Sequence, residues 1–314
     1  MALDQAAFRG IYVIVVTPFD DSGALDEAAL ERTLDFCFTA GVAGVVATAN
    51  ASEVGYLTET ERKRVAEITV AKAKGRAASV VGVSAAHARI SAEFAAHAEK
   101  VGADAVMAMP PTFHGPTRAE IMAFYKDLGR ASALPLILQN AMGPGATPMS
   151  AEFVVELANA VPTARFVKEE TAYPAQLTAD ILRLGGERIL GVMGGRAGRT
   201  LMEEARVGIC GTMPACEFAD LHVALWNAIE TGDTARSRAI FRHLLPLIDF
   251  ETSYGIPLCK EVLKARGVIP SAAWRQTGYR PLDATALAEM DTLLAGAAEF
   301  MHPDLRYTPR AAAA

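Results

Sequence analysis

Cysteine and histidine are scarce in this chain, and neither occurs in a metal-binding pattern. The four cysteines (Cys37, Cys210, Cys216 and Cys259) lie far apart in mostly apolar surroundings, and no two of them form a CxxC pair. The six histidines show no HxH or HExxH spacing. Zinc sites built from short motifs depend on such spacings, so we predict no metal site and interpret the cysteines as buried reduced thiols.

The sequence also lacks long runs of one chemical character. It has no uninterrupted stretch of about 18 apolar residues, which argues against a membrane span. Its first ten residues, MALDQAAFRG, have neither the cationic start nor the apolar middle of a signal peptide. The net charge is −6, from 30 basic and 36 acidic residues, and no basic run occurs. Because binding to a phosphate backbone needs clustered lysine and arginine, nucleic acid is not an expected partner. We expect a cytoplasmic protein with neither a membrane nor a nucleic-acid partner.

The chain does contain a regular alternation of β-rich and helical segments. Its 314 residues are 51% hydrophobic, enough for one barrel-sized core or two smaller ones. Continuous apolar runs are typical of parallel strands that are covered on both faces. They predict strands at 11–17, 44–49, 78–84, 104–109, 134–139, 164–168, 188–193 and 208–213. Apolar residues at three- and four-residue spacing predict helices at 26–40, 58–74, 89–101, 117–131, 150–160, 174–184 and 196–206.

Eight strands with helices between them predict an α/β fold of the (β/α)8 TIM-barrel type over residues 1–218. A doubly wound open sheet is the competing architecture, and the absence of a Gly-rich nucleotide fingerprint favours the barrel. Residues 219–305 are predicted to form a C-terminal helical region that packs on the barrel or on a partner subunit. Its expected helices are 219–231, 233–248, 255–266 and 283–301. We expect the tail, 306–314, to be disordered.

The ends of the strands carry the candidate chemistry, because the active site of such a barrel lies at the carboxyl ends of its strands. Only the strand 164–168 ends in a lysine, within RFVKEET. Burial at an apolar barrel mouth disfavours the charged form of Lys168, and a neutral amine can attack a carbonyl to form a Schiff base. The alternative is an ion pair at the rim between Lys168 and Glu169 or Glu170.

Several strand-end motifs together resemble one superfamily. TPF at 17–19, a loop ending in Glu53, MPP at 109–111 and VKEET at 167–171 are similar to motifs of the dihydrodipicolinate synthase and N-acetylneuraminate lyase superfamily. The resemblance runs from about residue 8 to residue 300. It implies a class I enzyme in which Lys168 forms the Schiff base with a small-molecule 2-oxo acid and no cofactor takes part. It also implies a homo-oligomer, a tetramer or a dimer.

The loop after the second strand is implied to bind the substrate carboxylate through backbone N–H groups and hydroxyls. The family pattern there is Gly-Thr/Ser-Thr-Gly-Glu, and this chain has Ala49-Asn50-Ala51-Ser52-Glu53 instead. Main-chain donors do not depend on residue type, so Asn50, Ala51 and Ser52 are retained as candidate substrate-binding residues. Glu53 is interpreted as a brace for the loop.

The larger departure concerns the proton relay. The family places a tyrosine at the end of the fifth strand, where this chain has Gln139-Asn140, and a second tyrosine is replaced by Phe113. An amide does not titrate near neutrality, so either the protein is a non-catalytic relative or another group carries the proton. Glu170 is the candidate, because positions 168 and 170 of a strand point to the same side. A solvated rim glutamate that caps the next helix is the alternative.

Asn-x-Ser-Glu after the second strand, Gln on the fifth and Lys-x-Glu-Thr on the sixth together resemble the L-2-keto-3-deoxyarabonate dehydratases. The resemblance implies a hydro-lyase that converts a 2-keto-3-deoxy-pentonate into 2-oxoglutarate semialdehyde. Lys168 would form the imine at C2, and Glu170 would remove a proton from C3. Further substrate contacts are implied by position for Gln139, Asn140, Thr171, Gly194 and Met213.

Two other functions stay open. An aldolase of 2-keto-3-deoxy sugar acids or other 2-oxo acids is the near alternative, although aldol cleavage needs a base for the C4 hydroxyl, the usual task of the missing tyrosine. A non-catalytic barrel that binds a 2-oxo acid is the alternative of another class. Arg196 and Arg199 either attract an anionic distal group, which would favour a sugar diacid, or are exposed charges. His114 is interpreted as polar surface.

Overall fold

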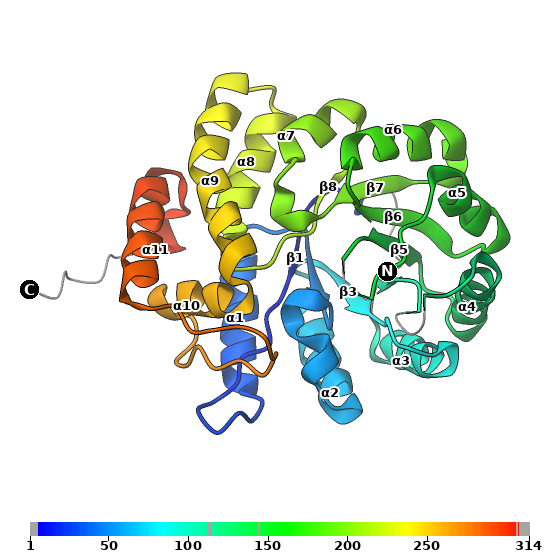
Figure 1. The fold of residues 1–314 in the computed structure, drawn as a ribbon, viewed down its shortest axis with the longest axis horizontal. Helices are drawn as coiled ribbons and strands as arrows, with labels where there is room; N and C mark the ends of the chain where they lie inside the picture. Colours follow the sequence, from blue (N-terminus) through cyan, green and yellow to red (C-terminus); the bar gives the residue numbers. More distant parts are fainter. Residues whose placement is uncertain (1–5, 112–114, 144, 306, 308–314) are drawn as a thin grey trace, which may run out of the picture.

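The computed structural model of the protein describes residues 6–111, 115–143, 145–305 and 307. Eight parallel strands pair in chain order and close into a barrel, because β1 pairs with both β2 and β8 (Figure 1). The strands are β1 (Gly10–Ile14), β2 (Gly44–Ala47), β3 (Ala78–Gly82), β4 (Ala105–Ala108), β5 (Leu136–Ala141), β6 (Ala164–Glu170), β7 (Gly191–Gly194) and β8 (Gly211–Thr212). The predicted (β/α)8 barrel is confirmed, and the open sheet is excluded by the β1–β8 pairing.

Side chains of each strand alternate between the barrel interior and the surrounding helices. On β6, Phe166 belongs to the cluster that fills the barrel, whereas Val167 belongs to a cluster beneath the helices. The same alternation continues along the strand. It directs Lys168 and Glu170 to the interior side, above the packed floor, and Glu169 to the helix side. The expectation that residues 168 and 170 share a side is confirmed by the contact between their side chains.

Strands β5 and β6 run further than the sequence predicts. Their pairing continues to Asn140 opposite Glu169 and Ala141 opposite Glu170. The predicted strand ends at 139 and 168 were therefore too early, because neighbouring parallel strands supply hydrogen-bond partners past the end of the apolar run. Glu170 consequently lies on a rigid strand and not in a loop.

The helices outside the barrel follow the predicted order with one correction. They are α1 (Glu27–Thr39), α2 (Glu59–Ala73), α3 (Ala88–Val101), α4 (Arg118–Ala131), α5 (Ala151–Ala160) and α6 (Pro174–Gly185). The helix predicted at 196–206 is wrong. A 3-10 turn, Arg196–Gly198, precedes a single turn of α7 (Leu201–Glu204) and a second 3-10 turn, Ala205–Val207. The reason is the positive φ of residues 196 to 198, which a right-handed helix does not accommodate.

The C-terminal part of the chain is helical and packs along one side of the barrel (Figure 1). It consists of α8 (Ala219–Glu230), α9 (Thr234–Tyr254), α10 (Ile256–Ala265) and α11 (Ala284–Ala297). One hydrophobic cluster includes Leu34 of α1, Leu225 of α8, Leu244 of α9 and Leu294 of α11. The extension therefore shares its core with the barrel. No helix in the described ranges is both long and apolar enough to cross a membrane. Of the predicted disordered tail, residues 306 and 308–314 lie outside the described residues.

Candidate active site

Lys168, Glu170 and Gln139 meet at the carboxyl ends of β5 and β6. Nζ of Lys168 lies 3.0 Å from Oε2 of Glu170, and Nε2 of Gln139 donates a hydrogen bond of 2.6 Å to Oε1 of the same carboxylate. The Lys168 and Glu170 side chains are only 3% and 12% exposed. A buried charge is costly unless it is paired, and here each ion is the partner of the other. Lys168 thus forms an ion pair with Glu170, which is the same residue that the sequence analysis proposes as the proton carrier.

Gly195, directly after β7, leaves space for the Glu170 carboxylate. A β-carbon at Gly195 would lie 2.7 Å from Cβ of Glu170, closer than carbon atoms pack. Glycine is therefore needed at position 195 because the Glu170 side chain lies so close, and not because the backbone has an unusual φ.

The turn that follows is held in a strained conformation. Arg196 and Ala197 have φ values of 51° and 54°, which non-glycine residues seldom adopt. Nε2 of the buried His222 lies 2.9 Å from the carbonyl oxygen of Ala197, and the Arg196 guanidinium donates to the carbonyl of Thr171. Such strain persists where the surroundings fix it, often at functional sites. The contacts hold Arg196 at the wall of the cavity described below.

On the helix side of β6, Glu169 forms a separate buried network. Its carboxylate accepts hydrogen bonds from Nδ2 of Asn140 (2.7 Å) and from both the backbone N–H and the hydroxyl of Thr171 (2.7 and 2.5 Å). Asn140 also exchanges hydrogen bonds with the backbone of Met149. Burial raises the pKa of Glu169 against the opposing effect of these donors. The network fixes the ends of β5 and β6 from outside the barrel.

The loop after β2 presents free main-chain donors. Residues Asn50–Ser52 form a 3-10 turn, and the hydroxyl of Ser52 donates to the carbonyl of Val15. Within the described part of the chain, no hydrogen bond uses the backbone N–H of Asn50 or Ala51. Both residues line the same cavity as Lys168. Two adjacent N–H groups of this kind can bind an anion.

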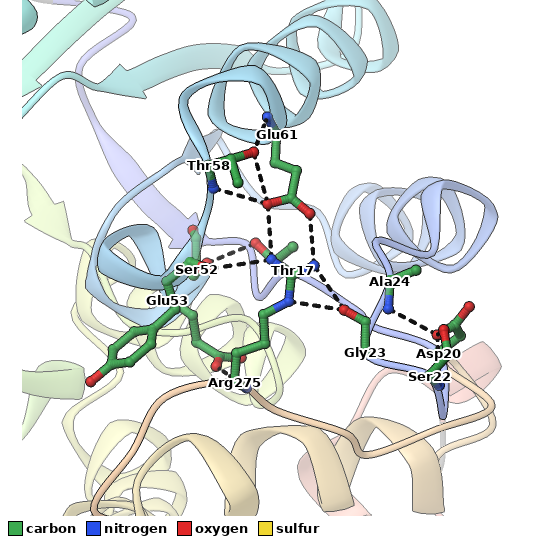
Figure 2. Close-up of polar contacts among 11 residues, drawn as sticks. Thr17, Asp20, Ser22, Gly23, Ala24, Ser52, Glu53, Thr58, Glu61 and Arg275 are labelled. Atoms are coloured by element: carbon green, nitrogen blue, oxygen red, sulfur yellow. Dashed lines mark hydrogen bonds and ion pairs between the residues drawn. The ribbon is translucent and has the colours of Figure 1, made fainter.

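Glu53 ties this loop to the C-terminal extension. Its buried carboxylate lies 2.5 Å from Nζ of Lys260 on α10 and accepts hydrogen bonds of 2.7 Å from the backbone N–H groups of Arg275 and Gln276. The Arg275 side chain in turn pairs with Glu61 at 2.7 Å (Figure 2). That ion pair lowers the pKa of Glu61 to about 2. The expectation that Glu53 braces the loop agrees with this network.

A cavity of about 890 Å³ lies at this mouth of the barrel. From the predicted site it is lined by Asn50, Ala51, Lys168, Glu170 and Met213. It is also lined by residues that the sequence analysis did not assign to the site, which come largely from α2 and the C-terminal extension: Glu59, Arg62, Glu251, Cys259, Gln276 and Tyr279. No sequence signal marks these residues, because only the packing of the extension against the barrel brings them to the site.

The other predicted site residues lie behind this wall or outside the described residues. Ser52, Asn140 and Thr171 direct their polar groups to protein partners, and Gln139 reaches the cavity through Glu170. Gly194 packs against the buried carboxylate of Glu204, where a β-carbon would lie 2.8 Å from Oε1. Arg199 lies at the surface, 3.4 Å from Asp249. Phe113 and His114 lie outside the described residues.

Glu204 is a further buried carboxylate beside the site. It is fully buried, and only its Oε2 has a partner within the described ranges, the hydroxyl of Thr200. Burial raises its pKa to about 7. A group of this kind changes its charge within the physiological range and thereby makes stability depend on pH.

The sequence and the fold both match known proteins. The profile of the dihydrodipicolinate synthetase family matches residues 7–295. An L-2-keto-3-deoxyarabonate dehydratase of Azospirillum brasilense is 33% identical over 268 residues, 84% of this chain and 86% of that protein. A 4-hydroxy-tetrahydrodipicolinate synthase of Nitrobacter hamburgensis is 30% identical over 250 residues, 77% and 81% of the two chains. The crystal structure of dihydrodipicolinate synthase from Rhodopseudomonas palustris superimposes with a TM-score of 0.87 at 26% identity, over 94% of this chain and 99% of that one.

Proposed function

The chain belongs to the dihydrodipicolinate synthetase family, and we propose that it is a Schiff-base-forming hydro-lyase that dehydrates a 2-keto-3-deoxy sugar acid. The proposed substrate is L-2-keto-3-deoxyarabonate and the proposed product 2-oxoglutarate semialdehyde, in line with the activity named for the Azospirillum relative. The observation that carries the proposal is the Glu170 carboxylate 3.0 Å from Nζ of Lys168, on a strand pair that has Gln139 where the family pattern has tyrosine.

Lys168 supplies the covalent step. Its neutral amine, after giving a proton to Glu170 or to water, attacks the C2 carbonyl and releases one water as the imine forms. The protonated imine withdraws electrons from C3 and makes its protons acidic. While it carries a positive charge next to Glu170, it keeps the buried carboxylate paired until that carboxylate takes the C3 proton.

Glu170 supplies the proton transfers. Its carboxylate lies beside the nitrogen that becomes bonded to C2, so C3, one bond further, comes within its reach. Removal of a C3 proton leaves an enamine, whose electrons expel the C4 hydroxyl as water, with the proton returned by Glu170. Loss of a proton from C5, protonation at C3 and tautomerisation give the aldehyde. Hydrolysis of the imine consumes one water, so one water is lost overall.

Gln139 and the loop after β2 orient these groups. The Gln139 amide holds Oε1 of Glu170 and leaves Oε2 directed at the Lys168 amine. The free N–H groups of Asn50 and Ala51 are assigned to the substrate carboxylate at C1. In this proposal Asn140 and Thr171 support the site through Glu169.

The aldolase alternative is disfavoured by the same residues. Aldol cleavage starts with removal of the C4 hydroxyl proton, and position 139 holds an amide, which cannot accept it. Dehydration needs a base at C3, the task that the proposal assigns to Glu170. A barrel that binds a 2-oxo acid without turnover would keep the Schiff base and lose the proton transfer.

One set of measurements separates these functions. The protein is incubated with L-2-keto-3-deoxyarabonate or pyruvate, reduced with borohydride and examined by peptide mass spectrometry. We expect a reduced adduct on Lys168, absent in Lys168→Met. Without reduction, wild type should form the semialdehyde. Glu170→Gln should still trap substrate but turn over about 10²- to 10⁴-fold more slowly. Absence of any adduct would refute the Schiff base. Release of pyruvate and glycolaldehyde would indicate the aldolase. Trapping of substrate without formation of any product would indicate the non-catalytic binding barrel.

A further inference from the structure

Three acidic side chains from distant parts of the sequence converge beside the cavity. Glu217 lies in the turn between β8 and α8, Glu251 lies near the end of α9, and Cys259 lies in α10. One ligand atom from each lies within 4.8 Å of the other two. Consecutive members are 34 and 8 positions apart, so no short motif marks the group in the sequence.

Glu217 is the member of the group whose surroundings indicate a ligand. Its side chain is fully buried, and in the described part of the chain no nitrogen or hydroxyl donor of another residue hydrogen-bonds either carboxylate oxygen; the facing thiol of Cys259 and carboxyl of Glu251 can donate only while they hold protons. Buried polar atoms are nearly always satisfied, and an unsatisfied buried carboxylate is among the costliest groups to leave alone. The polar side chains that face it are the other two members of the group, and both of these are acids as well.

No basic side chain within the described ranges pairs directly with this group, although the nearby charge of Arg266 favours the ionised form of Glu217. Neither Glu217 nor Glu251 forms an ion pair there. Arg266 packs against the same turn, but its guanidinium is bound to both oxygens of Asp220 and to the backbone carbonyls of Glu217 and Leu305. Burial raises the pKa of Glu217, Glu251 and Cys259, so without a cation the three groups must hold protons at this wall of the site.

We propose that Glu217, Glu251 and Cys259 form a binding site for a divalent transition metal of the zinc type. A thiolate with two carboxylates suits Zn²⁺ and Co²⁺ better than Mg²⁺ or Ca²⁺, which prefer oxygen ligands alone. Bonds of about 2.0–2.3 Å in a tetrahedral arrangement place two ligand atoms about 3.3–3.8 Å apart. The three atoms lie within 4.8 Å of one another, so side-chain shifts of about 1 Å would close the group on an ion.

The site joins three structural segments and opens toward the cavity. Glu217 is buried behind the wall, whereas Glu251 and Cys259 line the cavity itself. A metal held there fixes the turn after β8 to the α9–α10 junction and leaves its remaining coordination position toward the cavity. The inference does not rest on the proposed dehydration, because neither Lys168 nor Glu170 belongs to the group.

Metal analysis of the intact protein tests the proposal directly. Purified protein equilibrated with equimolar Zn²⁺ and then gel-filtered should retain about one metal per chain by plasma mass spectrometry. Co²⁺ should produce the near-ultraviolet absorption band of a cobalt–thiolate bond. Glu217→Gln and Cys259→Ser should each lower retained metal at least about 10-fold, and Cys259→Ser should remove the cobalt band.

Matched variants separate loss of the site from loss of the fold. Cys210→Ser changes another free cysteine outside the group and should keep both the metal and the band. Glu204→Gln changes another buried, partly unsatisfied glutamate and should do the same. If wild-type protein retains no metal and shows no cobalt–thiolate band, the group holds only protons and the proposal is wrong. This test uses wild-type protein, so it does not depend on whether a variant folds. Its outcome is also independent of the borohydride test of Lys168.

Discussion

Gly195 and Glu170 face each other across β6 and β7 so closely that a β-carbon on Gly195 would lie 2.3 Å from Oε2 of the Glu170 carboxylate. Oε2 is also the atom that lies 3.0 Å from Nζ of Lys168. The missing side chain of one residue therefore sets the position of the proposed base relative to the proposed Schiff-base nitrogen.

Replacing Gly195 with alanine should displace Glu170 and slow turnover. A shift of about 1 Å at a reacting group can cost about 100-fold, so we expect kcat to fall about 10- to 100-fold while borohydride still traps substrate on Lys168. Steady-state kinetics and adduct mass measure the two effects. Gly296→Ala is the control, because its new β-carbon would meet only an ordinary contact at 3.7 Å. Unchanged kcat in Gly195→Ala would show that Glu170 need not stay where it is.

Replacing Gln139 with methionine keeps the side-chain length but removes the donor to Glu170. A hydrogen bond to a charged group contributes about 1.5–3 kcal/mol, so we expect kcat to fall by about 10- to 100-fold. Since the substrate carboxylate is assigned to the loop after β2, KM should change little. A large rise in KM at constant kcat would instead place Gln139 in direct contact with substrate.

Breaking the buried pair of Glu53 and Lys260 should destabilise the protein strongly. Both side chains are 0% exposed, and loss of one partner leaves an uncompensated buried charge. We expect Lys260→Met to lower the free energy of unfolding by about 3–5 kcal/mol in urea titrations. The double variant with Glu53→Gln should be less destabilised than the sum of the single variants. Strict additivity would mean that the two charges do not interact.

Glu204 should make the folded protein less stable as the pH rises. Its folded pKa of about 7 lies above the ordinary value of 4.5, so the native state keeps a proton that the unfolded state has already lost. The loss of unfolding free energy that Glu204 causes is absent below pH 4.5 and grows as the pH rises. It reaches about 3 kcal/mol above pH 7.

The uncharged variant Glu204→Gln isolates this effect. Urea unfolding at pH 5 and pH 8 should show a smaller loss of stability with pH for Glu204→Gln than for wild type. Glu203 is exposed and only adds to the repulsion that raises this pKa, so Glu203→Gln should reduce the wild-type dependence much less than Glu204→Gln does. An equal pH dependence in wild type and Glu204→Gln would show that Glu204 is ionised in the folded state.

Much of the fold and the centre of the site follow from local sequence pattern. Apolar runs alternating with helical periodicity predict the barrel, and the two-residue period of a strand predicts that Lys168 and Glu170 share a side while Glu169 does not. Local pattern does not predict a backbone conformation that contacts with distant residues impose. The helix expected at 196–206 fails because residues 196 to 198 have positive φ, in a turn whose Ala197 carbonyl contacts His222, a residue 25 positions away in the chain.

The barrel, the lysine at the end of its sixth strand and the carboxylate two residues later can be predicted from the sequence, because each depends on periodicity along one segment. Their surroundings depend on how distant segments pack. The register of β5 on β6 brings Gln139 to Glu170, and Gly195, directly after β7, leaves room for that carboxylate. The C-terminal extension adds Tyr279 to the cavity wall and Glu251 and Cys259 to the buried acidic group. These contacts join residues that are distant in the chain, and local sequence pattern carries no information about such distances.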